Sequence, residues 1–143
     1  MRHPGTTLIE LLVVMAVLAM LLGIALPSAG RWRDESAVRA ARDELAAGLA
    51  IARAAAPGHG GASLVLDPQS GRFWIRTDDG RVFEPVGLGD RYGVRVDPGV
   101  AGPVIFRYDG LGIGRLTSRT VHVRRGRAEA GITVSAYGRY RRW

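Results

Sequence analysis

Near its start the chain carries a long apolar run that is preceded by a single acidic side chain. Residues 11–26, sixteen in a row, have no polar side chain, and two further apolar residues precede Glu10. A hydrocarbon core of about 30 Å requires a helix of about 20 apolar residues, so residues 6–29 are predicted to form a transmembrane helix. A charge inside such a span costs on the order of 2.5–3.5 kcal/mol and usually marks a function with a partner. Glu10 is therefore the first candidate functional residue.

Two simpler interpretations of this segment leave Glu10 unexplained. A cleaved secretory signal peptide has an apolar region of about 7–15 residues, no carboxylate within it, and a small-x-small cleavage site. In this chain Pro27 would occupy the third position before a cut that follows Ala29. A plain membrane anchor is the second alternative, and it gives the carboxylate no role.

A second helical pattern follows between residues 31 and 56, where alanine, a strong helix former, is abundant. Its apolar positions recur in steps of three and four residues, which places them on one face of a helix. These positions are Val38, Ala41, Leu45, Gly48 with Leu49, and Ala52. We expect Pro27 to bend the helix and Pro57 to end it. Residues 30–57 are thus predicted to form an amphipathic helix that continues the anchor.

After residue 57 the pattern changes to short alternating segments separated by turn signals about every eight to twelve residues. The predicted strands are 62–66, 72–76, 81–86, 92–96, 104–108, 119–125 and 130–136. This pattern is typical of an antiparallel β domain. The expected fold class is α+β, with a long N-terminal α-helix whose alanine-rich face packs on a C-terminal antiparallel β head domain, residues 58–143, of two small sheets.

Charge is distributed unevenly along the chain. Residues 1–102 hold equal numbers of arginines and acidic residues, whereas residues 103–143 carry the whole net charge of +7. A one-sided excess of this kind suggests an anionic partner such as nucleic acid or a membrane surface. A solvated, arginine-rich surface is the alternative. The chain has no cysteine, which is compatible with export but does not argue for it.

The last predicted strand carries a candidate phosphate-binding face. One of its two rows is apolar and is expected to face the core: Ile132, Val134 and Ala136. The other row consists of Thr133, Ser135, Tyr137, Arg139, Arg141 and Trp143. If the alternation continues past Gly138, this row places two arginines between two aromatic residues on an exposed face.

Such a row has the chemistry of a nucleic-acid contact. Arginine pairs bidentately with phosphate, and aromatic rings offer bases a stacking surface that tolerates any sequence. Further arginines that extend the candidate patch are Arg119, Arg124, Arg125 and Arg127. The alternative is a charged terminus that keeps an edge strand from pairing with other chains.

An enzyme is the contrasting class, and the sequence offers little support for it. The three histidines, His3, His59 and His122, have no metal-ligand partner at a typical spacing, so we expect neither a metal nor a cofactor. The chain has no cysteine nucleophile and no Gly-x-Ser-x-Gly elbow. The alternating glycines of residues 110–114 do not lead into a predicted helix, as a phosphate loop would require. We therefore predict no catalytic residues.

The N-terminal segment resembles the class III signal of type IV pilins and pseudopilins. The resemblance is carried by a short basic leader, Met1 to Gly5, followed by Thr6-Thr7-Leu8-Ile9-Glu10 and the apolar run. It implies that prepilin peptidase cuts between Gly5 and Thr6 and that the new amine of Thr6 is N-methylated. That amine would neutralise Glu10 of a neighbouring subunit during assembly. The family usually has phenylalanine at the position of Thr6, so this chain departs from the pattern there.

The C-terminal part resembles the FimT/GspH group of minor pilins and pseudopilins. The segments that carry this resemblance are 106–110, 121–123, 132–135 and 138–141. The FimT branch has a Gly-Arg-x-Arg signature linked to DNA capture in natural transformation, and Gly138, Arg139 and Arg141 match it. The middle of the chain, residues 57–102, matches only in its alternation.

Together these resemblances imply a minor subunit of a type IV pilus or of a type II secretion pseudopilus. The subunit would cross the inner membrane once, with a cytoplasmic N-terminus and a periplasmic head, before entering a periplasm-spanning fibre. Its expected partners are other pilins or pseudopilins, prepilin peptidase, the inner membrane and, for the added function, double-stranded DNA. The alternatives are an H-type secretion pseudopilin without a DNA role, whose basic tail touches a neighbour or acidic lipid, and a signal-anchored periplasmic β domain.

Overall fold

The structure is a computed structural model that describes residues 7–115 and 118–143, except for the side chains of residues 24–29. The chain divides into two compact units, Met1–Arg33 and Asp34–Trp143, and each is described by itself. Helix α1 (Leu8–Ala55) supplies residues to both units. The short 3₁₀ helix η1 (Ala56–His59) follows α1. It contains Pro57, the residue that was predicted to end the long helix.

In the first unit α1 exposes its apolar side chains on every side. Each residue from Leu8 to Gly23 is exposed, and among the large apolar side chains the exposed fraction is lowest at Leu18, 49%, and highest at Leu8, 76%. Apolar surface of this extent marks contact with a membrane or with another protein. Within the described part of the chain, no helix is both long enough and apolar enough to cross a membrane.

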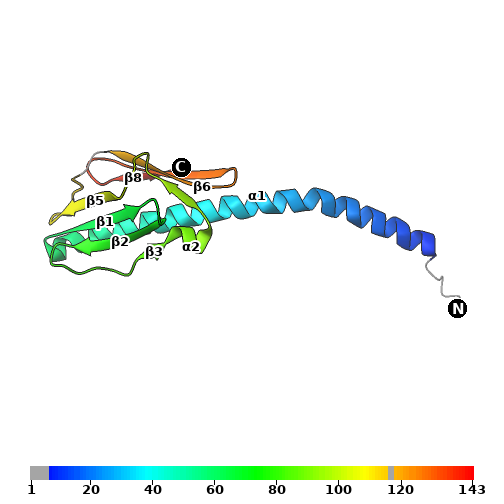
Figure 1. Cartoon of the computed structure of the whole chain (residues 1–143), viewed down its shortest axis with the longest axis horizontal. Coiled ribbons are helices and arrows are strands. Elements are labelled where there is room, and N and C mark those ends of the chain that lie inside the picture. Colours follow the sequence, from blue (N-terminus) through cyan, green and yellow to red (C-terminus); the bar gives the residue numbers. More distant parts are fainter. Residues whose placement is uncertain (1–6, 116–117) are drawn as a thin grey trace. The chain divides into compact units, whose positions relative to one another are not determined.

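The second unit contains two four-stranded antiparallel sheets that share a core with the C-terminal part of α1 (Figure 1). The first sheet has the order β3-β2-β1-β5, and the second has the order β4-β6-β7-β8. The strands of the first sheet are β1 (Gly61–Asp67), β2 (Arg72–Thr77), β3 (Val86–Gly87) and β5 (Val104–Asp109). Those of the second are β4 (Arg95–Asp97), β6 (Arg119–Arg125), β7 (Ala128–Val134) and β8 (Tyr140–Arg142). A one-turn helix, α2 (Leu88–Tyr92), joins β3 to β4.

The predicted apolar stripe of α1 forms one wall of this core. Val38, Ala41, Leu45, Leu49 and Ala52 are all at most 1% exposed. The missing side chain of Gly48 admits the ring of Phe73, since a Cβ atom there would lie 2.5 Å from the ring. The α+β prediction, with a long N-terminal helix and two antiparallel sheets, is confirmed.

Two predicted strands are shorter than the sequence indicated. The segment 81–86 forms only an isolated bridge, between Arg76 and Val82, before β3 begins at Val86. Pro85 precedes β3 and lacks the N–H group that a ladder requires. The predicted start of the strand 92–96 was also wrong, because Tyr92 ends α2 and Gly93 follows with a left-handed φ of 63°. Strand β4 begins only at Arg95.

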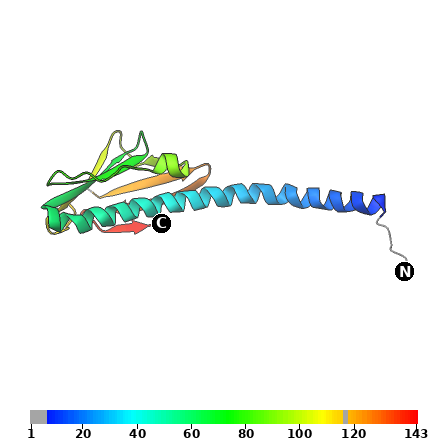
Figure 2. The ribbon, with the colours of Figure 1, turned by 90° about the horizontal axis from the view of Figure 1, so that it is seen from below.

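The largest departure is at the C-terminus, where the predicted single strand is two strands. The chain reverses after β7 in a turn closed by the Gly138 N–H, which donates to the Ser135 carbonyl over 2.9 Å. Strand β8 then pairs antiparallel with β7 and lies beside α1, where it is the red arrow of Figure 2. Arg142 contacts Asp43 of α1 over 3.3 Å. The terminus is therefore held to the helix by an ion pair.

Candidate assembly segment and nucleic-acid interface

The predicted assembly residue Glu10 caps the start of its own helix. The Thr7 N–H donates to the Glu10 carboxylate over 3.1 Å, and the Glu10 N–H donates to Thr7 Oγ1 over 3.3 Å. This reciprocal pair is a capping box, and its Thr-x-x-Glu spacing is visible in the sequence. The predicted processing residues Gly5 and Thr6 lie outside the described residues. Glu10 thus has an intrachain partner in addition to any partner it meets on assembly.

The second sheet has a buried inner face and a polar outer face. Alternate residues of β6 and β7, such as Val121, Val123 and Ile132, are fully buried. The residues between them point the other way, because successive side chains of a strand alternate between the two faces. The register pairs Thr120 with Thr133 and His122 with Gly131 on this second face.

Strand β8 adds Arg141 to the same outer face, and Arg139 and Trp143 lie two residues away on either side of it. Arg141 pairs with Thr133 in the ladder, and Trp143 exchanges two backbone hydrogen bonds with Gly131, of 2.9 and 3.0 Å. Directly paired residues share a face of a sheet. The reversal therefore overturns the predicted continuous strand but keeps Arg139, Arg141 and Trp143 in one outward row. The outer face, as named from here on, comprises Arg95, Asp97, Thr120, His122, Arg124, Glu129, Gly131, Thr133, Arg139, Arg141 and Trp143.

The glycine of the Gly-Arg-x-Arg match has a structural role. Gly138 has a φ of +78°, in the left-handed region that favours glycine. A Cβ atom at this position would lie 2.5 Å from the ring of Tyr108 and 3.1 Å from the Gly114 backbone. Gly138 thus allows the turn that places Arg139 and Arg141, and it is itself buried.

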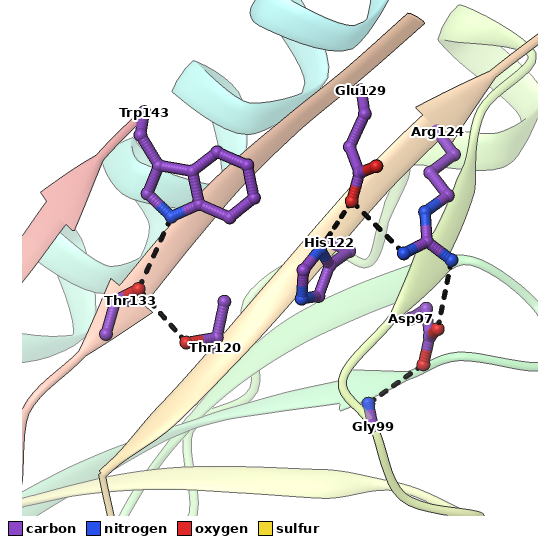
Figure 3. A network of polar contacts seen from close by, with 8 residues as sticks. All are labelled: Asp97, Gly99, Thr120, His122, Arg124, Glu129, Thr133 and Trp143. Atoms are coloured by element: carbon purple, nitrogen blue, oxygen red, sulfur yellow. Dashed lines mark hydrogen bonds and ion pairs between the residues drawn. The ribbon is translucent and has the colours of Figure 1, made fainter. Parts of the chain in front are cut away.

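Arg124 lies on the outer face but is ion-paired there (Figure 3). Its guanidinium contacts Glu129 over 3.1 Å and Asp97 over 3.5 Å. The Glu129 carboxylate also contacts the His122 ring over 2.5 Å. The hydrogen bond from Arg124 is the main reason that the pKa of Glu129 lies below its usual value, and the hydrogen bond from His122 is the second. Arg124 therefore meets a phosphate only in competition with two carboxylates.

The other predicted arginines divide into bound and unbound side chains. Arg125 contacts Asp34 over 3.0 Å and donates to the Tyr92 carbonyl over 2.5 Å, so the structure does not bring it to the outer face. Arg127 is exposed in the turn between β6 and β7. In residues 7–115 and 118–143, the side chains of Arg127, Arg139 and Arg141 make no hydrogen bond or ion pair.

Sequence reasoning missed the charge partners and one arginine of this face. Arg95 of β4 lies opposite Arg124 in the register and is exposed. Only the cross-strand pairing brings them together, and they are 29 positions apart in the sequence. Across the described residues, no group of three or more metal-ligating side chains is placed to hold a metal ion.

Two separate comparisons with known proteins support the predicted methylation motif at the N-terminus and the predicted fold. Residues 2–26 match the prokaryotic N-terminal methylation motif. The fold is similar to the crystal structure of the type IV minor pilin FimU of Pseudomonas aeruginosa, with a TM-score of 0.56 and 16% sequence identity, over 73% of this chain and 86% of that one. No curated protein sequence matches the chain. The chain thus has a type IV pilin-like fold and carries a methylation motif, as its resemblance implied.

Proposed function

We propose that this chain is a minor pilin or pseudopilin subunit that waits in the inner membrane and then enters a fibre through α1. The observation that carries this proposal is the methylation motif, residues 2–26, on a helix whose described side chains from Leu8 to Gly23 are all exposed. Lipid covers these side chains before assembly, and neighbouring helices cover them in the fibre. The head domain lies in the periplasm.

Assembly on this proposal depends on charge pairing at the start of α1. Prepilin peptidase removes residues 1–5, and the exposed amine of Thr6, once methylated, remains a cation. The Glu10 carboxylate of an adjacent subunit then pairs with it in the apolar interior of the fibre. An unpaired charge in such surroundings is strongly unfavourable, by several kcal/mol, so the pair sets the register between stacked helices.

Intact mass spectrometry of the membrane-extracted full chain tests this proposal. The expected mass lacks residues 1–5 and includes one methyl group. A mass that corresponds to the full chain, or to a cut near Ala29, contradicts it. The variant Glu10→Gln keeps a hydrogen-bonding oxygen for Thr7, so it is expected to fold normally. Because it lacks the charge, it is expected to enter fibres poorly in an assembly assay. Normal incorporation of this variant would leave a tethered β domain as the better description.

The added role is DNA binding by the outer face, with Arg139 and Arg141 on phosphates. The two acidic residues of this face, Asp97 and Glu129, are both engaged by Arg124. Arg139 and Arg141 have no carboxylate partner in the described residues, so their guanidinium groups remain available to an external anion. Arginine binds phosphate in a bidentate geometry, which makes these two side chains the principal contacts.

Titration of the full chain in neutral detergent with duplex DNA tests this role. Binding is expected to weaken steeply as salt rises, because each phosphate contact releases counterions. The double variant Arg139→Ala/Arg141→Ala should bind at least about tenfold more weakly, and its salt slope should fall by roughly two. The matched control Arg76→Ala/Arg81→Ala removes the same charge from exposed side chains of the other sheet and its loop.

The two outcomes distinguish the candidate functions. If the double variant binds DNA as wild type does, Arg139 and Arg141 have no DNA role. The chain is then better described as a secretion pseudopilin, and its loss should stop protein secretion but leave transformation intact. If only the double variant loses binding and transformation falls with it, the DNA role stands.

A further inference from the structure

The charges of the outer face are balanced on one side and unbalanced on the other. On β4, β6 and β7 the two arginines Arg95 and Arg124 are matched in number by the carboxylates of Asp97 and Glu129, both of which contact Arg124. At the β8 edge, Arg141 lies in the strand and Arg139 immediately precedes it, and residues 139–143 contain no acidic residue. A polyanion is therefore attracted to the β8 edge and gains little by crossing the sheet towards β4.

The β8 row, which consists of Arg139, Arg141 and Trp143, ends in an aromatic ring that is held in place. Both backbone hydrogen bonds between Trp143 and Gly131 fix its main chain, and the indole Nε1–H donates to Thr133 Oγ1 over 3.4 Å. The benzo ring lies directly over Gly131, since a Cβ atom on that glycine would lie 2.4–2.9 Å from three ring atoms. The His122 ring meets the indole edge-on, with ring centroids 5.4 Å apart (Figure 3).

One surface of this indole remains available to a ligand. Although Gly131 and His122 cover part of it, Trp143 is 51% exposed. Thr133, which holds the indole nitrogen, is itself hydrogen-bonded to Thr120 over 3.0 Å, so the support extends to the neighbouring strand. A ring that is already immobilised loses little conformational entropy when a flat group stacks on it. The site thus combines a preorganised aromatic platform with two unpaired guanidinium groups.

We propose that the β8 row binds nucleic acid through an unpaired base, which stacks on Trp143 while Arg139 and Arg141 hold phosphates of the same strand. Residues two apart on a strand are spaced by about 6.7 Å, so the row presents cation, cation and ring at regular steps along one direction. A base inside a duplex has both faces covered by its neighbours, so only a single strand or a frayed end offers one to the indole. This inference rests on the proposed DNA role and adds to it a preference for single-stranded segments and frayed ends over intact duplex.

The discriminating experiment compares three probes on the full chain in neutral detergent. They are a labelled thymidine homopolymer, an abasic homopolymer of the same length, and a blunt duplex of that length. Truncation of an aromatic residue that stacks on a base lowers the affinity roughly fivefold or more. We expect the thymidine strand to bind the wild-type chain at least about fivefold more tightly than the abasic strand, with quenching of tryptophan fluorescence.

Variants assign this difference to one ring. Trp143→Leu should remove the preference for thymidine over abasic strands but leave binding of the abasic strand unchanged. Trp143→Phe, which keeps an aromatic ring over Gly131, should retain part of the preference. Trp32→Leu is the matched control, because Trp32 is also exposed and belongs to the first unit. Its preference should equal that of wild type.

The outcomes separate this inference from the proposed function. Equal affinity of the wild-type chain for thymidine and abasic strands overturns the stacking role, whatever Trp143→Leu does. If all three probes then bind in a manner that depends on Arg139 and Arg141, the DNA role stands without the stacking. If no probe binds, both the DNA role and this inference are wrong.

Discussion

The two parts of α1 both carry apolar side chains but differ in their polar positions and in what surrounds them. In the first unit, Leu18 is 49% exposed although it belongs to a continuous apolar run. In the second unit, Leu45 is fully buried, and charged residues occupy the opposite side of the same helix. The second part buries its apolar stripe in the core of its own unit, whereas the first part exposes apolar side chains on every side. The presence or absence of a polar face, rather than helix formation itself, therefore indicates whether a helix is covered within its own chain or exposes apolar surface to a partner.

Truncation of one leucine in each part should give the largest contrast. We expect Leu45→Ala to lower the free energy of unfolding of the second unit by about 2–5 kcal/mol, because it removes buried methyl groups and leaves a cavity. Leu18→Ala should leave that free energy unchanged. Denaturant titration of the full chain in detergent, followed by tryptophan fluorescence, measures both, because Trp74 and Trp143 belong to the second unit. Equal losses in the two variants would contradict the division into a self-sufficient unit and an incomplete one.

The two helical glycines Gly48 and Gly30 sharpen the same comparison. A Cβ atom on Gly48 would lie 2.5 Å from the Phe73 ring, whereas nothing lies within 4 Å of one on Gly30. Gly48→Ala is therefore expected to destabilise the second unit by about 1–3 kcal/mol through overpacking. Gly30→Ala should be neutral or stabilising, since alanine is the better helix former. Thermal unfolding measures both, and a higher Tm for Gly48→Ala would show that Phe73 moves aside without cost.

A smaller effect, confined to the second unit, is expected from the buried Tyr108. Its hydroxyl has no hydrogen-bond partner among the described residues, and burial raises its pKa to about 12. The folded state therefore holds this proton more tightly than the unfolded state, whose pKa is about 10. The resulting stability is complete below pH 10 and declines as the pH rises towards 12, with a loss of roughly 1.4 kcal/mol at pH 11.

The variant Tyr108→Phe isolates this pH dependence. It removes the titrating hydroxyl, so its free energy of unfolding should change less than that of wild type between pH 8 and pH 11. Tyr92, whose pKa is also raised, chiefly by its hydrogen bond to Glu44, is present in both proteins and cancels in the difference. Parallel pH profiles for the two proteins would show that the Tyr108 hydroxyl reaches water.

Local periodicity accounts for the parts of the fold that the sequence predicted well. The apolar stripe from Val38 to Ala52 follows from helical spacing alone, and strand β6 has the predicted bounds, Arg119–Arg125. The Thr7–Glu10 capping box was not predicted, although its two members lie within one helical turn and their spacing is a known signature of a helix start. Each of these features depends on neighbours in the chain.

Features that depend on distant residues were not predictable from one sequence. The reversal at Gly138 joins β7 to the short strand β8 at a turn that the alternating pattern does not mark, so the alternation alone indicated one long strand. The ion pairs that occupy Arg124 and Arg125 involve Asp97 and Asp34, which only the tertiary fold brings near. Charge counting treated all these arginines alike, whereas the fold separates those with carboxylate partners from those without.

The capping box at the start of α1 has a consequence for maturation. Thr7 and Glu10 both lie on the C-terminal side of the peptide bond between Gly5 and Thr6. A protease that severed this bond would release the leader without removing either member of the cap. Both hydrogen bonds of the cap would thus be available to the first turn of the helix in the precursor and in the trimmed subunit. The carboxylate could then exchange its contact with Thr7 for a neighbour's amine without the helix having to refold.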